Sequence, residues 1–416
     1  MSGRLRRYLS VFLCVFPGTS KGPCSIFFFE ASQLIKTGNL EELRQRHCLP
    51  SGWWPHVVTG TSRTTLGGCA AMNTHGKNVW HVGPIGEYIS SLSLLTPSGD
   101  TVNCSSTDNG ELFRAAIGGF GMLGIITRLT LQLRSVSSGL VAVNEYAEKN
   151  LAATFDRFES AAGGSDFMVA WLDAFARGSR LGRGHIQCAA HVEESEPGSL
   201  SLANQELPTR VAGLLPKTWI RHLLQPCWND TGVRWINEAR YRAARVRHGR
   251  QSRLPVVWYQ FLLDSVPGFE RCFGRSGLIQ HQVLVPDAHA YDVFEQLIRL
   301  QQRKGLVNYL TVMKKHRTDG FLMSYGVDGY SLAQDFRVTR NNRSRLWELC
   351  HQMDELVAAA GGRFYLAKDA TLLPQHYRAS MPPESLEEFF RLKRQLDPDE
   401  LLQTDLWRRL LRPLRG

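Results

Sequence analysis

The sequence predicts an α+β protein with two domains, and three observations support this. Residues 50–136 alternate short apolar segments, helix-like segments and glycine-rich loops. Residues 138–361 combine strand-like alternation with longer segments whose apolar residues recur at helical spacing. At 416 residues, with 43% hydrophobic and 21% charged residues, the chain is long and apolar enough to bury two cores. Strand-rich sheets backed by helices are typical of the α+β class.

The individual elements follow from local patterns. The turn sequence TPSGD separates two strand-like segments and predicts a hairpin over residues 90–103. Residues 111–117, ELFRAAI, predict a helix, and the alternating leucines of residues 129–133 predict a strand. In the second half, strands are expected at residues 280–285 and 330–338, and helices at residues 290–304 and 343–360.

The most informative segment is TGTSRTTLGGCAAMNTHGKN, at residues 59–78. Its glycines, where backbone without a Cβ can pass close to a ligand, are Gly60, Gly67, Gly68 and Gly76. A helix starting near Leu66 would direct free N–H groups at an anion. His75 and Lys77 share one face if the backbone is extended. The segment suits a phosphate-bearing cofactor beside a cation, although ordinary turns also use such glycines.

A second glycine cluster spells G-x-G-x-x-G at Gly119, Gly121 and Gly124. A Rossmann site would place this motif after a strand and before a helix. Here the predicted helix precedes the glycines and the predicted strand follows them. The order argues against a Rossmann site and leaves a helix–loop–strand unit whose backbone could still line a cofactor.

Together these segments resemble the FAD-dependent oxidoreductases of the vanillyl-alcohol oxidase type, whose FAD-binding domain is of the PCMH type. The HGKN and AKD motifs carry the resemblance most specifically. The matching segments are GT-x5-GG-x6-HGKN (60–78), LFRAAIGGFGMLGII (112–126), AWLDA (170–174), LIQHQVLVP (278–286), VMKK (312–315), GGRFYLAKD (361–369) and LDPDELLQTDLWRRL (396–410).

The resemblance implies an FAD-binding domain from residues 50–137 and 362–416. It implies an antiparallel-sheet substrate domain with helices from residues 138–361. Residues 1–49 are then an atypical or misassigned N-terminus, because the Arg-Ser-Tyr-Gly loop with which the family grips the pyrophosphate does not occur in this sequence. We expect an N-terminally truncated FAD-binding domain that holds non-covalent FAD weakly.

The resemblance also assigns roles to residues. The catalytic set beside the flavin is Lys368, Tyr365, His75 and Lys77. The cofactor-binding set is Gly60, Thr61, Thr65, Gly67, Gly68, Asn73, His75, Gly76, Asn78, Gly121, Gly124, Ile125, Ile126 and Tyr365. The substrate-binding set is Lys77, Trp171, Gln282, Lys314, Ser331 and Lys368.

Two of these assignments make geometric demands. Tyr365 and Lys368 are three residues apart, so a turn must bring them to one site. Lys314 is followed by Lys315, so the sequence leaves open which lysine faces the substrate. A lysine beside a flavin can remove the hydroxyl proton of an alcohol, which is why Lys368 is the expected base. The nine cysteines form no C-x-x-C pair, and no metal site is expected.

By resemblance, the function is oxidation of a sugar hydroxyl by hydride transfer to FAD, with a polyprenyl-phosphate-linked pentose as substrate and a partner reductase completing an epimerisation. A small-molecule sugar or lactone is the other substrate class. One alternative is an aldonolactone oxidase such as D-arabinono-1,4-lactone oxidase. Another is an inactive truncated flavoprotein homologue.

Positive charge is concentrated in residues 208–253, where ten Lys or Arg residues face two acidic ones and four Trp or Tyr residues lie among them. We expect a helical or mobile basic excursion from the substrate domain that touches an anionic membrane, with an ordinary solvated helix face as the alternative. No nucleic-acid recognition module accompanies it. The apolar run at residues 8–16 after three arginines has the shape of a signal peptide without a cleavage site. A cytoplasmic protein, peripheral at the inner membrane, is therefore favoured over an exported one.

Overall fold

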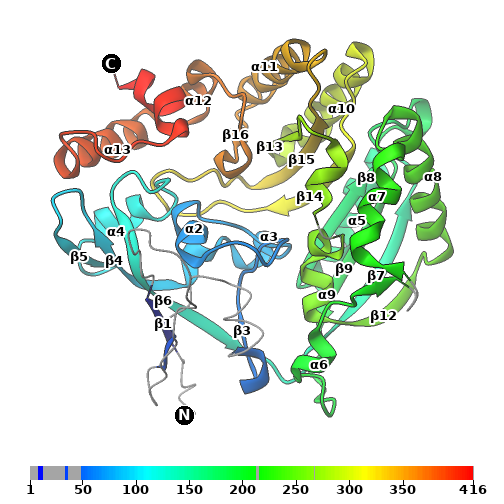
Figure 1. Ribbon diagram of the computed structural model, residues 1–416, viewed down its shortest axis with the longest axis horizontal. Coiled ribbons are helices and arrows are strands. Elements are labelled where there is room, and N and C mark those ends of the chain that lie inside the picture. Colours follow the sequence, from blue (N-terminus) through cyan, green and yellow to red (C-terminus); the bar gives the residue numbers. More distant parts are fainter. Residues whose placement is uncertain (1–7, 13–32, 36–47, 212–214, 267, 416) are drawn as a thin grey trace.

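The computed structural model describes residues 8–12, 33–35, 48–211, 215–266 and 268–415. This part of the chain has two large β-sheets with helices packed around them, and a small two-stranded sheet of β10 (Arg210–Val211) and β11 (Leu215–Pro216) (Figure 1). The α+β class predicted from the sequence is thus confirmed. Most of residues 1–49 lie outside the described residues, so the atypical N-terminus stays a prediction. Within that segment, a strand at Tyr8–Phe12 pairs with the first sheet.

The smaller sheet has strand order β2-β1-β6-β4-β5, with β3 also paired to β6. The predicted hairpin is present as β4 and β5, and the glycine cluster leads from α4 into β6 in the predicted helix–loop–strand order. The bounds are β1 Tyr8–Phe12, β2 Gln33–Ile35, β3 Trp53–Pro55, β4 Ile89–Leu95, β5 Thr101–Ser105, β6 Ile125–Ser135, α2 Leu66–Ala71, α3 Val79–Val82 and α4 Gly110–Ala116.

The larger sheet is antiparallel, with order β12-β7-β9-β8-β14-β15-β13-β16. The strands and helices predicted for the second half appear as β13, β15, α10 and α11, within two residues or so at each end. The strand bounds are β7 Leu140–Glu148, β8 Phe167–Leu172, β9 Gly184–His191, β12 Arg250–Pro255, β13 Leu278–Pro286, β14 Leu310–His316, β15 Gly329–Arg337 and β16 Arg363–Phe364.

Helices cover the two faces of the larger sheet differently. On one face, Phe155 of α5 and Phe294 of α10 pack against each other, and Phe155 also packs against Tyr330 of β15. On the other face, Arg240 of α8 lies over Trp171 of β8. The helices are α5 Leu151–Ala161, α6 Leu202–Gln205, α7 Lys217–Leu224, α8 Asp230–Val246, α9 Val256–Gln260, α10 Asp287–Lys304 and α11 Arg343–Ala359. The part of this second face that α8 leaves uncovered is turned toward the smaller sheet.

The C-terminal helices α12 (Pro374–Ser380) and α13 (Pro383–Leu396) return to the smaller sheet (Figure 1). Lys393 of α13 is fully buried, donates to the carbonyl of Met122 at 2.9 Å and pairs with Asp397. Phe389 packs edge-on against Phe120. These contacts join residues 383–397 to residues 120–122, and one continuous hydrophobic core connects both sheets.

The basic stretch is only partly the excursion that the sequence predicts. Its middle is helical, but Arg250–Pro255 is the edge strand β12, hydrogen-bonded to β7. Its charges are also partly neutralised by acids outside the stretch, since Arg247 pairs with Glu145 and Arg253 with Glu196. A count of charges along the sequence could not include these partners. Among the described helices, none is long and apolar enough to cross a bilayer.

Candidate active site

A cavity of about 450 Å³ lies between the glycine-rich segment and the uncovered face of the larger sheet. Successive side chains of a strand point to opposite faces, so residues of four neighbouring strands, β8, β14, β15 and β13, reach the same cavity. The sheet contributes Val169, Gln280, Gln282, Leu310, Val312, Lys314, Ser331, Ala333 and Asp335. The strand register confirms the shared face. Ala333 of the central strand β15 is paired with Val312 of β14 on one side and with Gln282 of β13 on the other.

The glycine-rich segment forms the opposite wall. It contributes Thr59, Gly60, Thr61, Thr64, Thr65, Gly68, Cys69, Met72, Thr74, His75 and Lys77. The predicted helix begins at Leu66 and is capped by Thr65, whose hydroxyl accepts from the backbone N–H of Gly68 at 3.1 Å. A Cβ at Gly68 would lie 2.9 Å from that hydroxyl, so glycine is required for this cap. The cap uses one of the N–H groups that the sequence offered to an anion.

A tight turn brings Tyr365 and Lys368 to the cavity together. Residues Leu366–Lys368 form a single 3₁₀ turn, and the N–H of Lys368 donates to the carbonyl of Tyr365 at 3.0 Å. The N–H of Tyr365 in turn donates to the carbonyl of Gln282 at 3.0 Å, which fixes the turn to β13. The geometric demand made by this pair is met.

Lys77, Lys314 and Lys368 line the cavity, and Asp335 is the one carboxylate among the described residues that line it. Burial lowers the pKa of Lys314 to about 7, assisted by repulsion from Lys368. Burial also lowers the pKa of Lys368, which nearby Asp335 opposes. The pKa of Lys77 is lowered well below its usual value by burial and by Lys314, and its Nζ donates a hydrogen bond to the carbonyl of Tyr259. This arrangement gives amines that can accept a proton, and a bound anion would favour their charged forms.

Burial also shifts the pKa values of neighbouring titratable groups toward their neutral forms. Burial, with Lys314, His316 and Lys368 nearby, lowers the pKa of His75 well below its usual value. His316 behaves likewise and shares a hydrogen bond of 2.8 Å with the hydroxyl of Ser331. Burial raises the pKa of Asp335, which accepts from Gln280 at 2.9 Å. Among the described residues that line it, the cavity thus has three lysines and one carboxylate, Asp335.

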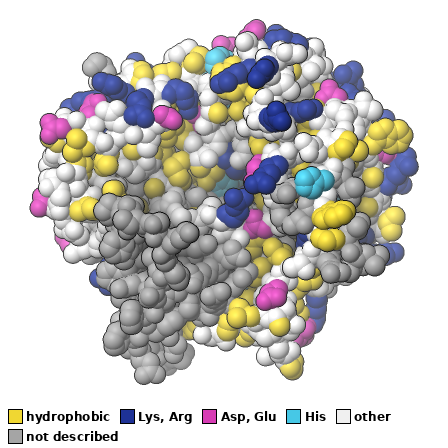
Figure 2. Space-filling model, viewed as in Figure 1, with side chains coloured by type: hydrophobic (Ala, Val, Ile, Leu, Met, Phe, Trp, Pro, Cys, Tyr) yellow, Lys and Arg dark blue, Asp and Glu magenta, His cyan; other side chains and the backbone are white. Residues whose placement is uncertain are grey.

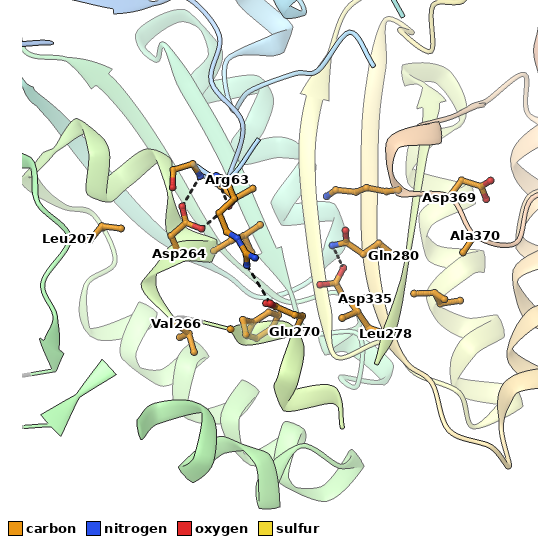
Figure 3. A pocket seen from close by; sticks show the side chains of 17 residues that line it. Arg63, Leu207, Asp264, Val266, Glu270, Leu278, Gln280, Asp335, Asp369 and Ala370 are labelled. Carbon is orange, nitrogen blue, oxygen red and sulfur yellow. Dashed lines mark hydrogen bonds and ion pairs between the residues drawn. The ribbon is translucent and has the colours of Figure 1, made fainter. Parts of the chain in front are cut away.

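A second cavity, of about 850 Å³, adjoins the first and opens to solvent. The two share Thr61, Leu263, Gln280, Asp335 and Lys368. In Figure 3, Arg63, Asp264 and Glu270 lie on one side of this outer cavity, and Gln280 and Asp335 on the other. Its apolar lining includes Leu207, Leu263, Val266, Phe269, Leu278 and Ile279. Figure 2, which has the viewpoint of Figure 1, shows a depression near the middle of the molecule with Lys and Arg side chains beside it.

A clasp joins the glycine-rich segment to Asp264 and Glu270 along one side of this entrance. Asp264, in the segment 262–270 that borders the outer cavity, accepts from the hydroxyl of Thr61 at 2.7 Å and from the N–H of Ser62 at 2.7 Å. Arg63 and Glu270 add an exposed ion pair at 3.3 Å. Both carboxylates come from residues that the sequence did not single out, because nothing in their spacing linked them to residues 61–63.

The structure brings most, but not all, of the expected site residues together. Those lining the inner cavity are Gly60, Thr61, Thr65, Gly68, His75, Lys77, Gln282, Lys314, Ser331, Tyr365 and Lys368. Those outside its lining are Gly67, Asn73, Gly76, Asn78, Gly121, Gly124, Ile125, Ile126 and Trp171.

Several of the residues outside the lining have structural partners instead. Asn73 has φ +44° and accepts from the N–H of Gly86 at 3.0 Å. Asn78 donates to the carbonyl of His56 at 2.7 Å. A Cβ at Gly124 would clash with the side chain of Leu94, so this glycine is explained by packing. The guanidinium carbon of Arg240 lies 4.6 Å from the ring centroid of Trp171, which is outside the lining of the inner cavity.

Gln280, Tyr325, His316 and Asp335 are polar groups in or directly behind the cavity that were not assigned roles. For Asp335, the available sequence signal was its two-residue spacing from Ala333 and Ser331, which places all three on one face of a strand. Tyr325 lies in the loop between β14 and β15, where no sequence periodicity exists to indicate which way a side chain points.

The residues present fit a flavin ring. Two buried polar atoms at the cavity, Gln282 Oε1 and Thr74 Oγ1, have no hydrogen-bond partner among the described residues. Such atoms can be satisfied by the N–H and carbonyl groups of a bound heterocycle. Tyr365 offers an aromatic wall, and the lysines can stabilise negative charge on a ring. Gly60 and Thr65 would border its phosphate-bearing side, whereas the N–H of Gly68 and the hydroxyl of Thr61 already donate to Thr65 and Asp264.

Comparison with known proteins supports this assignment. The chain is 27% identical over 377 residues to decaprenylphosphoryl-beta-D-ribose oxidase of Mycolicibacterium smegmatis, which covers 89% of this chain and 79% of that protein. It is 29% identical over 379 residues to an uncharacterised protein of Streptomyces coelicolor, covering 87% and 97% respectively. Over 71 residues, 17% of this chain and 13% of the relative, it is 34% identical to D-arabinono-1,4-lactone oxidase of Debaryomyces hansenii. No family model matches the chain. The resemblance stated from the HGKN and AKD motifs is confirmed.

Proposed function

We propose that this relative of flavin-dependent sugar oxidases is an FAD-dependent oxidoreductase that oxidises a hydroxyl group of a phosphate-bearing sugar. The observation that carries the proposal is the convergence of Lys314, Lys368 and Lys77 with neutral His75 on one cavity. A cavity lined by three lysines and one carboxylate suits a ligand with a phosphate group, because a bound anion favours the charged form of a neighbouring lysine. The similarity to an oxidase whose named substrate is a polyprenylphosphoryl pentose supports the same substrate class.

Alcohol oxidation requires removal of a hydride from carbon and a proton from oxygen. When bound, FAD supplies the two-electron acceptor for the hydride. Lys368 is the expected proton acceptor, because burial lowers its pKa and raises the fraction of neutral amine at Nζ. Lys314 and Lys77 would hold the anionic part of the substrate. The apolar walls of the inner cavity limit access of water to the reacting atoms.

The outer cavity supports a lipid-linked substrate over a free sugar. Its apolar residues lead from Lys368 to solvent over a volume of about 850 Å³, which suits the first part of an aliphatic chain. The short similarity to an aldonolactone oxidase keeps soluble lactones as the second candidate class. The reductase that would complete an epimerisation stays a prediction.

The test is anaerobic reduction of the purified protein reconstituted with FAD. We expect the visible flavin absorbance to disappear on addition of decaprenylphosphoryl-β-D-ribose and to persist with D-arabinono-1,4-lactone. The reverse pattern would favour the lactone oxidase. A flavin-loaded protein that neither compound reduces would refute the proposal, and a protein that retains no FAD would favour the inactive homologue.

The variant Lys368→Ala tests the role of Lys368 as the proton acceptor. Loss of the proton acceptor should reduce substrate-driven flavin reduction by a factor of about 100 to 10,000, with FAD content retained. Lys315→Ala is the control, because Lys315 faces away from the cavity and pairs with Glu159 at 2.6 Å. Equal rates in the Lys368 variant and the wild type would show that another group removes the proton.

A further inference from the structure

A chain of hydrogen bonds runs from the loop between β14 and β15 into the inner cavity. The hydroxyl of Tyr325 lies 2.6 Å from the carbonyl oxygen of Asn73 and 3.0 Å from Nδ1 of His75. On the other side of the ring, Nε2 of His75 lies 3.2 Å from Nε2 of Gln282. All four residues are more than nine-tenths buried.

The chemistry of the groups fixes the direction of every bond in this chain. The carbonyl of Asn73 can only accept, so the hydroxyl of Tyr325 must donate to it. That hydroxyl then offers only lone pairs to His75, so Nδ1 must carry the proton. A neutral imidazole with a proton on Nδ1 has an acceptor at Nε2, which receives a hydrogen from the amide nitrogen of Gln282. The lowered pKa of His75 and the raised pKa of Tyr325 agree with these neutral forms.

The orientation of the Gln282 amide follows from this chain of hydrogen bonds. With its nitrogen directed at His75, the amide presents Oε1, a buried acceptor without a partner among the described residues, to the cavity it lines. The opposite tautomer of His75 would reverse the amide and present a donor instead. The cavity, whose lysines are hydrogen-bond donors, would then lose the neutral acceptor that Gln282 Oε1 provides.

We propose that Tyr325 is a positioning residue, which holds His75 in the Nδ1–H tautomer so that Gln282 offers a hydrogen-bond acceptor to the bound ligand. The ligand group that Gln282 recognises is therefore a donor, either a hydroxyl of the sugar or a ring N–H of the flavin. The tautomer itself does not depend on the proposed function, whereas the identity of the donor rests on it.

The tautomer can be measured directly by NMR of protein labelled with ¹⁵N at histidine, where protonated and unprotonated ring nitrogens have distinct shifts. The signals of His75 are assigned by their loss in His75→Asn. We expect a proton on Nδ1 in the wild type and its transfer, in part or whole, to Nε2 in Tyr325→Phe. Tyr330→Phe, which removes a buried phenol hydrogen bond to Glu159 on the other face of the sheet, should leave His75 unchanged. A proton on Nε2 or a charged ring in the wild type would overturn the proposal.

A double-mutant cycle of Tyr325→Phe and Gln282→Leu then tests whether Tyr325 acts through Gln282. Each single variant should weaken ligand binding by about three- to tenfold, and the double variant should be no weaker than Gln282→Leu alone. FAD titration of the apoprotein reports a flavin donor, and the KM for decaprenylphosphoryl-β-D-ribose at saturating FAD reports a sugar donor. Additive effects in the affected titration, or no effect in either, would refute the positioning role even if the tautomer is as expected.

Discussion

Lys314 and Lys315 are consecutive residues of β14, yet their side chains lie on opposite faces of the larger sheet. Lys314 lines the inner cavity, whereas Lys315 forms an ion pair with Glu159 of α5 at 2.6 Å. The pairing of β14 with β15 places Lys314 opposite Ser331, a cavity residue, and Lys315 opposite Tyr330, a core residue. A difference of one position thus separates a ligand-facing cation from a surface ion pair.

Replacing each lysine by methionine should separate their roles. Lys314→Met should weaken binding of a glycosyl phosphate by roughly ten- to a hundredfold, because a hydrogen bond to a charged group contributes about 1.5–3 kcal/mol. Lys315→Met loses an ion pair whose partner is half exposed, and such pairs contribute about 0–1 kcal/mol to stability. Isothermal titration of both holoproteins with the same glycosyl phosphate makes the comparison. Equal losses in the two variants would contradict the assignment.

The titration of Lys314 predicts how anion binding depends on pH. Because the pKa of Lys314 is lowered to about 7 in the folded protein, its ammonium form declines as the pH rises through 7. Affinity for a glycosyl phosphate should therefore fall between pH 7 and 9 beyond what phosphate ionisation alone explains. Lys314→Arg keeps its charge over this range and should remove the additional decline. A wild-type affinity that is constant across this range would show that Lys314 stays charged or does not contact the anion.

The same shift has a consequence for stability. In the unfolded chain Lys314 takes its ordinary pKa of about 10.4, so between about pH 7 and pH 10 the unfolded state binds more protons than the folded state. The free energy of unfolding should rise with pH across this window, and the penalty of burying the cation is fully present only below pH 7. Urea unfolding of the apoprotein at several pH values should show a smaller rise in Lys314→Met. An identical pH dependence in that variant would contradict the shift.

The sequence predicted those parts of the molecule that local pattern determines. The helix at Leu66, the hairpin of β4 and β5, and the strand β13 follow from capping, turn and alternation signals that each lie within a few residues. By resemblance, it also indicated eleven residues that line the cavity, including the pair Tyr365 and Lys368.

The features that the sequence did not predict depend on contacts between segments that are far apart in the chain. Asp264 meets Thr61 across 203 positions, and Tyr325 meets His75 across 250, so no local periodicity could indicate either pair. Trp171 was assigned by resemblance; it lies outside the lining of the inner cavity, and its role as a substrate contact stays a prediction. Arg250–Pro255 was read as part of an excursion because an edge strand of charged residues has no apolar alternation.

The clasp at the entrance predicts a difference between two acidic residues. Asp264→Asn should loosen the segment 262–273, because a carboxylate with two hydrogen bonds of 2.7 Å becomes an amide with a single acceptor oxygen. Amide hydrogen exchange in that segment should accelerate by about five- to fiftyfold, as expected for a loss of about 1–2 kcal/mol. Glu270→Gln breaks only the exposed pair with Arg63, where the side chains are 70% and 52% exposed, and should change exchange little. Equal protection in the wild type and Asp264→Asn would show that the clasp does not hold the segment.

Contact with a membrane surface remains a proposal, and the structure changes which residues should mediate it. Trp219 of α7 and Trp235 of α8 are 61% and 73% exposed, whereas Arg242 and Arg247 already pair with Glu238 and Glu145. We therefore expect the indoles to contribute more than these arginines. Trp219→Ala and Trp235→Ala should each weaken binding to phosphatidylglycerol-containing vesicles by roughly 1–2 kcal/mol.

Two controls make this prediction specific. Tyr291→Ala removes an exposed aromatic residue, 38% exposed, from α10 on the other face of the larger sheet, and should leave vesicle binding unchanged. Arg245→Gln removes an exposed charge that forms no ion pair with a described residue, so it should weaken binding by about 1 kcal/mol at low salt and less at high salt. Sedimentation with vesicles of increasing phosphatidylglycerol content measures all four variants. If the two tryptophan variants bind as tightly as Tyr291→Ala, the α7–α8 surface is an ordinary solvated face, and a lipid-linked substrate must reach the outer cavity by another route.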